Sequence, residues 1–575
     1  MPATEAQPAT GTDTGFAIEL PIVSSNNPAP DLLRELLAEQ QRLTAVETFS
    51  REHAAGAIPA QARYYSKLLP ATSPGPGQQY AFDVDLDRCS GCKACVTACH
   101  TLNGLDEHET WRDVGMLMGG TTAQPVMQHV TTACHHCLEP ACMHGCPVDA
   151  YEKDPVTGIV KHLDDQCFGC QYCTLACPYD VPKYHAAKGI VRKCDLCSDR
   201  LAVGEAPACV QACPHEAIAI RVVDVQQVAE DAEANLFLPA APEPHITQPT
   251  TTYRTRRVFP RNMLPADYYS VSPQHPHWPL IVMLVLTQLS VGAFCIALAL
   301  ESLVTAGAAG PLRRIQATSA LGLGLLALAA STLHLGRPQY AFRAVIGLRH
   351  SWLSREIVAF GLFAGAAILY AGAAWFVESQ PELMQFLGWT VAVTGLIGVF
   401  CSVMIYVFTR RDFWSLNATM IRFGLSTLLL GGATTWVTVL IAIRAGVGGA
   451  SPDTLQSCGY WLSRGLLSVG IAKLLFELSL FRHLGDRRTT NLKRSALLMI
   501  GPLSNVTLAR FAAGILGGIV MPLMLMASQS DEFSRSSMSI LVVMLFVACL
   551  IGELLERYLF FAAVASPRMP GAIRV

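Results

Sequence analysis

The chain has 575 residues, of which 51% are hydrophobic and 15% charged, and its formal net charge is −2. This length is enough for several domains, and the composition is too apolar for one soluble protein of this size, so a membrane-embedded part is predicted. The near-neutral charge gives no support to nucleic-acid binding. The 20 cysteines are spread unevenly, because sixteen of them lie between Cys89 and Cys213.

The first eighty residues hold no cofactor motif. Residues 31–43 read DLLRELLAEQQRL, and the leucines are spaced to share one face of a helix. We expect residues 1–80 to be an N-terminal extension, a partly irregular docking arm, with a disordered tail as the alternative. Residues 1–30 lack the basic start and apolar core of a signal peptide, and no twin-arginine pair occurs near the start, so no export signal is predicted.

Residues 81–222 form a cysteine-rich domain with four runs of four cysteines each. The first and third runs have the ferredoxin spacing C-x2-C-x2-C-x3-C, whereas the second and fourth widen the gap before the third cysteine. A proline follows the last cysteine of every run except the first, where His100 stands. The sixteen residues are Cys89, Cys92, Cys95, Cys99, Cys134, Cys137, Cys142, Cys146, Cys167, Cys170, Cys173, Cys177, Cys194, Cys197, Cys209 and Cys213.

This spacing suits cubane iron–sulfur clusters. Each cluster needs four thiolates, of which a tight loop supplies three, and in two-cluster ferredoxins the fourth comes from the end of the other run. Sixteen cysteines therefore predict four [4Fe–4S] clusters with no ligand missing. The alternatives are disulfides, which are typical of small secreted domains, and zinc, which favours separated C-x2-C pairs. The other four cysteines, Cys295, Cys401, Cys458 and Cys549, are expected to be ordinary buried residues.

The second half of the chain is predicted to be a membrane anchor. Residues 223–277 are rich in proline and threonine and are expected to be a linker toward the membrane. Residues 278–565 hold eight apolar stretches, each able to cross a hydrocarbon core of about 30 Å, which takes about 20 helical residues. They lie near 279–304, 315–335, 356–377, 385–408, 421–444, 460–481, 498–528 and 537–563.

The number of spans and one boundary stay open at this stage, with seven or nine spans as alternatives. Pro502, Asn505 and Arg510 interrupt the seventh stretch, so its spanning part is expected near 511–528. Residues 566–575 are expected to be a C-terminal tail. The predicted fold class is multidomain: an α+β double ferredoxin-like iron–sulfur domain followed by an all-α transmembrane bundle of eight helices.

Both halves resemble subunits of one enzyme family. The segments CSGCKACVTAC, CHHCLEPACMHGCP, CFGCQYCTLACPYDVP and KCDLCSDRLAVGEAPACVQACP are similar to the electron-transfer subunit of the dimethyl sulfoxide reductase family of molybdoenzymes, over residues 80–222. LHLGRP at 333–338, SWLSREI at 351–357 and ERYLFF at 556–561 resemble the membrane anchor subunit of the same enzymes. The chain is therefore similar to a natural fusion of the two subunits.

The resemblance implies a crosswise pairing of the runs. Carried onto this sequence, the ligand sets are Cys89, Cys92, Cys95 with Cys213; Cys194, Cys197, Cys209 with Cys99; Cys134, Cys137, Cys142 with Cys177; and Cys167, Cys170, Cys173 with Cys146. Related nitrate reductase subunits have tryptophan and a three-iron cluster at the place of Cys170, so the cysteine here implies four cubanes. The spacing alone does not establish this pairing.

The resemblance also implies a function. The chain has no P-loop and no dinucleotide fingerprint, so we expect a non-catalytic subunit of an oxidoreductase complex that relays electrons. The implied flow runs from quinol to a molybdopterin-containing catalytic subunit that reduces an S-oxide, N-oxide, nitrate or similar acceptor. Reverse flow, from a donor such as sulfite to quinone, and a membrane scaffold with structural clusters are the alternatives.

His334, with Arg337 close behind it, is the candidate quinol site. Quinol oxidation releases two protons, and an imidazole that titrates near neutral pH is a suitable acceptor. In the family that the chain resembles, a histidine in this place is tied to quinol binding. The alternative is a loop histidine that only caps the preceding helix.

Charged residues in the anchor raise two further expectations. Charges inside a bilayer are costly, so the i,i+4 pairs Lys473–Glu477 and Glu553–Arg557 are each expected to be neutralised within the pair. The alternative for these residues and for Glu356 is a functional role, in a proton route or in the wall of a quinone pocket. With eight spans, the loops on the side of the iron–sulfur domain hold twelve arginines and lysines against five on the other side. This predicts a cytoplasmic iron–sulfur domain on a multi-pass protein of the cell inner membrane.

Overall fold

The computed structural model describes residues 29–40, 47, 51, 62–107, 109–301, 306–377, 380–445, 452–528 and 535–571. The chain divides into two units, Met1–Arg63 and Tyr64–Val575. In the first unit, helix α1 spans Ala29–Gln40, as the leucine spacing predicts, and Leu33, Leu36 and Leu37 are exposed on it. The end of the predicted helical segment, including Leu43, lies outside the described residues.

A small sheet in the second unit joins the two ends of the cysteine-rich region. Strand β1 (Gln78–Asp85) precedes the first cysteine run and pairs antiparallel with β8 (Ile218–Asp224), which follows the fourth run. Buried Phe82 of β1 stands opposite buried Ile220 of β8. Because these strands pair, the first and fourth runs are held side by side.

The other strands form a second sheet and two hairpins. The second sheet has the order β10-β2-β3, in which β2 (Asp113–Gly120) pairs antiparallel with β3 (Pro125–Thr132) and with β10 (Leu264–Pro265). The hairpins are β4 (Tyr151–Lys153) with β5 (Val160–His162) and β6 (Lys183–His185) with β7 (Ile190–Arg192). The first hairpin connects the second cysteine run to the third, and the second hairpin connects the third run to the fourth.

Short helices carry part of each cysteine run. They are α4 (Ala94–Leu102), α5 (Ala141–Gly145), α6 (Tyr172–Ala176), α7 (Ser198–Ala202) and α8 (Ala208–Gln211). Helix α4 contacts α8, and α5 contacts α6. The first run therefore lies against the fourth, and the second lies against the third.

The segment 223–277, which the composition predicts to be a linker, contains secondary structure. Helix α9 (Val225–Glu233) begins at Asp224, whose side chain accepts hydrogen bonds from the amides of Gln226 and Gln227. Strand β9 (Thr252–Arg254) extends the first sheet parallel to β1, and β10 (Leu264–Pro265) extends the second. The segment thus adds an edge strand to both sheets before it reaches the anchor.

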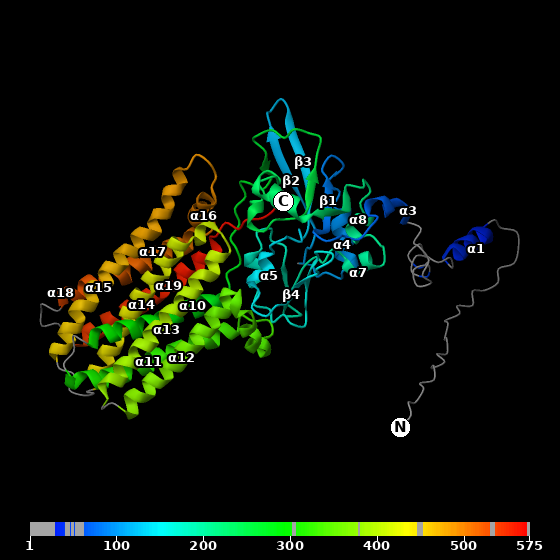
Figure 1. Cartoon of the computed structure of the whole chain (residues 1–575). Helices are drawn as coiled ribbons and strands as arrows, with labels where there is room; N and C mark the ends of the chain where they lie inside the picture. The colour runs from blue at the N-terminus through cyan, green and yellow to red at the C-terminus, as the bar shows by residue number, and fades with distance from the viewer. Residues whose placement is uncertain are drawn as a thin grey trace, which may run out of the picture. The chain divides into compact units, whose positions relative to one another are not determined.

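The anchor is a set of long helices, seen side by side in Figure 1. Within the described residues, seven helices are long and apolar enough to cross a membrane, where the sequence predicts eight. The long helices are α10 (Trp278–Glu301), α11 (Ala306–Thr332), α12 (Trp352–Phe376), α13 (Pro381–Phe408), α14 (Leu416–Arg444), α15 (Pro452–Leu478), α17 (Ser504–Ile515), α18 (Met521–Ser528) and α19 (Arg535–Ala562).

Two predicted stretches differ from expectation. The sixth stretch is α15, which carries Arg464, Lys473 and Glu477 and is not among the seven apolar spans. The seventh stretch is a short helix α16 (Asn491–Ile500) followed by α17 and α18, which a π-helical turn joins into one span, Ser504–Ala527. The predicted boundary near residue 511 is therefore too late, because Arg510 lies inside the span and finds partners there.

Buried ion pairs explain how the bundle accepts its charges. Lys473 and Glu477 pair at 3.5 Å, as predicted. The predicted Glu553–Arg557 pair is wrong, because Glu553 faces Lys473 at 3.2 Å and Arg510 at 3.1 Å on other helices. Arg557 pairs instead with its neighbour Glu556 at 3.4 Å. For Glu553, pairing between helices, which chain spacing does not reveal, therefore replaces the predicted pair within one helix.

Several contacts fix the anchor against the cysteine-rich domain. The Tyr172 hydroxyl donates to the Ile405 carbonyl at 2.8 Å, and Arg411 donates to the Leu175 carbonyl at 3.1 Å. After α19 the chain returns to the second sheet, where the Met116 amide donates to the Gly571 carbonyl at 3.3 Å. The segment that follows α19 therefore reaches β2 at Gly571, as Figure 1 shows.

Candidate functional site

The cysteine loops share an unusual backbone conformation. The residue before the second cysteine of every run has a positive φ: Gly91, His136, Gly169 and Leu196. Glycine adopts this conformation without strain, and in two runs it is required for space as well. A Cβ on Gly91 would lie 2.6 Å from the His129 ring, and one on Gly169 would lie 2.2 Å from the Gly189 carbonyl oxygen. Each run thus folds into a tight loop around its first two cysteines.

The structure gathers the sixteen cysteines into four sets of four, which we number as centres. Centre 1 is Cys89, Cys92, Cys95 and Cys213, and centre 3 is Cys134, Cys137, Cys142 and Cys177; each set lines a small cavity of its own. Centre 2 is Cys99, Cys194, Cys197 and Cys209, and centre 4 is Cys146, Cys167, Cys170 and Cys173.

Electrostatic interactions between thiols support the membership of centres 2 and 4. In centre 2, burial raises the pKa of Cys99 to about 12, with further contributions from Cys209 and Cys197. In centre 4, burial raises the pKa of Cys146 to about 11, and Cys167 contributes. Both sets combine cysteines from different runs, and all four centres match the crosswise pairing that the family resemblance implies.

These sets fit iron–sulfur clusters better than the alternatives. All 20 cysteines are free of disulfides. A zinc ion binds sulfur at about 2.3 Å, and within the described residues no three His, Cys, Asp or Glu side chains converge as ligands of a single ion would. Thiols that burial keeps protonated need a strong positive charge to become thiolates, and the iron of a cluster would supply it.

The four centres follow one another across the domain. Thiols of neighbouring centres interact electrostatically, as between Cys95 and Cys209 for centres 1 and 2, and between Cys194 and Cys134 for centres 2 and 3. The buried Tyr151 lies near both Cys142 of centre 3 and Cys173 of centre 4. Centre 1 reaches the surface, because Cys92 is exposed. The arrangement forms a series from centre 1 to centre 4.

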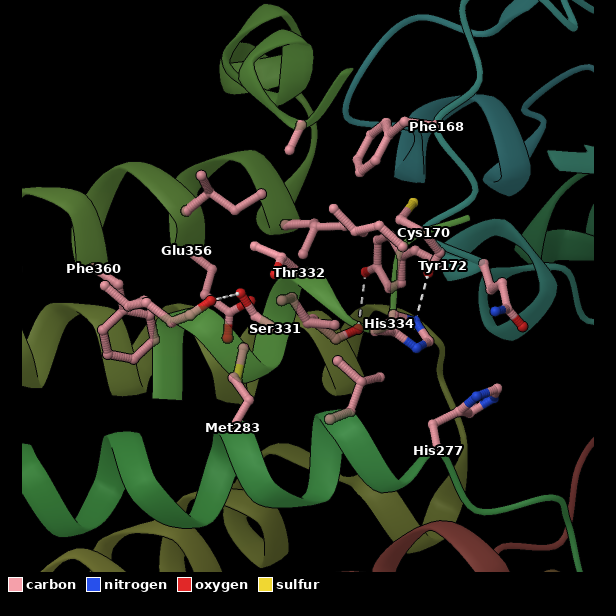
Figure 2. A pocket seen from close by; sticks show the side chains of 18 of the residues that line it. Phe168, Cys170, Tyr172, His277, Met283, Ser331, Thr332, His334, Glu356 and Phe360 are labelled. Atoms are coloured by element: carbon pink, nitrogen blue, oxygen red, sulfur yellow. Dashed lines mark hydrogen bonds between the residues drawn. The ribbon is translucent and has the colours of Figure 1, made fainter. Parts of the chain in front are cut away.

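A cavity of about 300 Å³ adjoins centre 4 where the domain meets the anchor. Cys170 and Tyr172 line it from the cysteine-rich domain, and His334, His277 and Glu356 line it from the anchor. The remaining walls are mostly apolar: Phe168, Leu175, Leu280, Met283, Leu328, Leu335, Leu353, Ile357, Phe360 and Ile405. In Figure 2, Glu356 reaches the cavity from α12, away from the end that Cys170 lines. The cavity suits a flat apolar ligand with a few polar atoms.

His334 connects this cavity to centre 4. Its Nε2 lies 3.0 Å from the Cys170 carbonyl oxygen (Figure 2). A carbonyl oxygen only accepts, so Nε2 carries the proton and the neutral ring keeps Nδ1 as an acceptor. Burial lowers the pKa of His334, although its hydrogen bond to Cys170 raises it in part. Burial, together with the nearby His334 and His275, lowers the pKa of His277 to about 4. Both rings are therefore neutral at pH 7.

The comparisons with known proteins agree with these two halves. The family model for a 4Fe-4S dicluster domain matches residues 125–223, and the model for the DMSO reductase anchor subunit (DmsC) matches residues 273–455. The B subunit of the anaerobic dimethyl sulfoxide reductase of Haemophilus influenzae is 34% identical over 189 residues, which is 31% of this chain and 91% of that protein. The chain belongs to the dimethyl sulfoxide reductase family.

Further relatives show the same domain in other settings. The Escherichia coli K12 protein of the same description is 36% identical over 180 residues, 30% of this chain and 86% of the relative. The hydrogenase-2 operon protein HybA of E. coli O157:H7 is 32% identical over 221 residues, 34% of this chain and 66% of the relative. Within its family, this chain is a natural fusion: an electron-transfer iron–sulfur subunit joined to the membrane anchor of a dimethyl sulfoxide reductase-type complex.

The second residue of the candidate quinol site, Arg337, does not line the cavity. Its side chain donates to the carbonyls of Asp164 at 3.0 Å and Lys188 at 3.2 Å, and its amide donates to the Phe168 carbonyl at 3.0 Å. Beside it, Gly336 lies so close to Gly189 that a Cβ would stand 2.1 Å from the Gly189 carbonyl oxygen. The LHLGRP loop therefore holds His334 in place against the third cysteine run.

Three other residues that line the cavity are Glu356, His277 and Tyr172, and of these the sequence offers a pocket role, as an alternative, for Glu356 alone. Glu356 carries a signal, because it is a lone carboxylate in an apolar segment; it is 3% exposed, and the Ser402 hydroxyl donates to its carboxylate. His277 lies just before α10, and its ring centroid is 5.1 Å from that of His334. Tyr172 lies within the third cysteine run. Nothing in the sequence places His277 or Tyr172 beside Glu356.

Proposed function

We propose that this chain transfers electrons between the quinone pool and a molybdopterin catalytic subunit. The sixteen cysteines hold four [4Fe–4S] clusters at centres 1–4 of a double ferredoxin-like domain, and quinol is oxidised in the cavity beside centre 4. The electrons leave at centre 1 toward the partner, which reduces an S-oxide, N-oxide, nitrate or similar acceptor. The family supplies the partner, because its catalytic subunits carry molybdopterin, whereas this chain has no substrate-binding motif of its own.

The observation that carries the proposal is the shared wall of the cavity. One residue, Cys170, supplies both a sulfur of centre 4 and the carbonyl that binds His334. A quinol in the cavity thus meets a proton acceptor and an electron acceptor that a single hydrogen bond connects. Centre 1, at the other end of the series of centres, has an exposed cysteine and suits contact with a partner.

The residues of the chain divide the chemistry between them. Quinol oxidation releases two electrons and two protons, and the clusters, when bound, accept the electrons one at a time. His334 Nδ1 accepts the hydrogen of one quinol hydroxyl, and the Glu356 carboxylate, held by Ser402, accepts the other. The apolar walls keep water from the ring, and Tyr172, which is tied to Ile405, closes the side toward the domain.

Replacing Cys170 tests the assignment of centre 4. In Cys170→Ala, centre 4 lacks one thiolate, so we expect a three-iron centre in its place and a fall from about sixteen to about fifteen iron atoms per chain. Iron analysis and electron paramagnetic resonance (EPR) of the oxidised protein measure this, and quinol should reduce the variant more slowly. Cys295→Ala, in α10, is the matched control and should keep all its iron. Unchanged iron in Cys170→Ala would remove this cysteine from the ligands.

Eight crossings of the membrane account for the contacts better than seven. The chain enters the anchor from the cysteine-rich domain at α10 and returns to that domain after α19, where Gly571 contacts Met116. An even number of crossings follows. Helix α15 supplies the eighth crossing. Arg411, just before α14, contacts the cysteine-rich domain, so α14 runs away from that domain. The loop after α15 is back on the side of the domain, because the Thr489 carbonyl accepts from the Tyr268 hydroxyl at 2.9 Å.

We place the iron–sulfur domain on the cytoplasmic side of the inner membrane, on the strength of its arginine-rich loops. Some of these arginines also dock the domain, because Arg343 donates to the Asp165 carbonyl at 3.0 Å and Arg411 to that of Leu175. Both ends of the anchor share one side, so a reporter fused after Val575 should show the cytoplasmic side. A fluorescent protein that works in the cytoplasm should fluoresce there, and a phosphatase that works only in the periplasm should stay inactive. Phosphatase activity there would reverse the orientation.

A further inference from the structure

Arg112 lies buried between centres 1 and 2. It is 2% exposed, and its Nη1 donates to the Thr131 hydroxyl at 3.1 Å, while that hydroxyl lies 3.5 Å from the Cys95 sulfur. Its Nε and Nη2 have no hydrogen-bond partner among the described residues. Burial by itself would lower the pKa of Arg112, but thiolates of both centres, Cys209 and Cys95 foremost, raise it. The guanidinium therefore faces sulfurs of two centres.

Lys193 lies buried between centres 2 and 3, as Arg112 does between centres 1 and 2. It is 3% exposed, and its Nζ donates to the Cys194 carbonyl at 2.9 Å, to the Val160 carbonyl, and to the Cys134 sulfur at 3.6 Å. Like Arg112, it faces cysteines of two successive centres.

Two other arginines of the domain are neutralised by carboxylates. Arg192, the neighbour of Lys193, pairs with Glu109 at 3.0 Å, and Arg200 pairs with Glu205 at 3.1 Å. Burying a cation without a counter-charge is costly, so Arg112 and Lys193 need a negative group in the space that they face. Clusters held by thiolates provide that negative charge, and each becomes more negative on reduction.

We propose that Arg112 and Lys193 set the reduction potentials of the clusters, each acting on the two centres that it separates. The inference rests on the proposed function, since it requires the clusters. A fixed positive charge in a medium of low dielectric favours the reduced state, so it raises the potential of both flanking centres. The two residues position charge and take no part in ligation.

Redox titration of the purified whole chain, followed by EPR, tests the proposal. Arg112→Gln and Lys193→Met remove one charge each, and each should lower two of the four midpoint potentials. We expect the reduction equilibrium of each affected centre to shift at least tenfold, which is about 59 mV for one electron. One midpoint, that of centre 2, should fall in both variants, while that of centre 4 moves least. Arg112→Lys and Lys193→Arg keep the charge and should restore the potentials.

A matched control and iron analysis separate the outcomes. Lys161→Gln removes a charge from a partly exposed site on β5 and should leave all four midpoints unchanged. Full iron content with unmoved midpoints in Arg112→Gln and Lys193→Met would overturn the inference. Loss of iron from both neutral variants would also overturn it, in favour of a structural role. Failure of the proposed function looks different, since the unmodified chain itself would then lack the clusters or would hold clusters that dithionite reduces and quinol does not.

Discussion

His334→Ala should assemble all four clusters and yet lose their reduction by quinol. The variant removes Nδ1, the acceptor of the first quinol proton, while every cysteine stays in place. General base catalysis contributes about 10²–10⁴-fold to such a step, so the rate of cluster reduction after mixing with quinol should fall by at least about 100-fold. Rapid-mixing absorbance measures this rate, and dithionite, which needs no proton acceptor, should reduce the variant at the normal rate.

His350→Ala separates proton transfer from loop contact. The His350 Nε2 lies 2.9 Å from the Cys146 carbonyl oxygen, so this histidine also touches a cysteine of centre 4, but it does not line the cavity. If proton acceptance is what matters, His350→Ala keeps most of its quinol-driven rate. Equal losses in the two variants would reduce both histidines to docking contacts. Normal quinol reduction in His334→Ala would remove His334 from the mechanism.

Gly336→Leu should uncouple the anchor from the clusters. A side chain there cannot be accommodated, because its Cβ would stand 2.1 Å from the Gly189 carbonyl oxygen and 2.7 Å from the Gly189 Cα, both backbone atoms. The LHLGRP loop must then move away from the third cysteine run and carry His334 with it. We expect full iron content, normal reduction by dithionite and a loss of quinol-driven reduction at least as large as that of His334→Ala.

The control for this variant is another glycine of the same anchor segment. Gly322 in α11 has open space where a Cβ would stand, so Gly322→Leu adds the same side chain without a collision. It should retain quinol-driven reduction. If Gly336→Leu behaved like Gly322→Leu, the close approach of the loop to the cysteine-rich domain would have no part in coupling the two halves.

The cysteine centres could be predicted largely from the sequence, whereas the cavity could not. Spacing, the following prolines and the number of cysteines indicate four clusters, since a run of this kind has one strong interpretation. Which run completes which centre depends on strands such as β1 and β8, whose pairing brings distant segments together. The crosswise sets could therefore be expected from the family resemblance and not from spacing.

The cavity combines residues that no local pattern connects. Tyr172, His277, His334 and Glu356 come from four different segments, and only docking of the domain on the anchor brings them to one place. Arg337 illustrates the opposite error: it is near His334 in the sequence, yet it binds carbonyls outside the cavity. The ion pairs of the bundle show the same limit, because Glu553 finds its partners on neighbouring helices.

The most direct test of the proposed electron transfer from quinol is an EPR measurement of the purified, oxygen-free protein before and after quinol is added. The proposed function predicts about sixteen iron atoms per chain and reduced-cluster signals that appear with quinol alone, without a partner subunit. Signals that appear with dithionite but never with quinol would contradict it, because the electrons would then have no entry from the membrane.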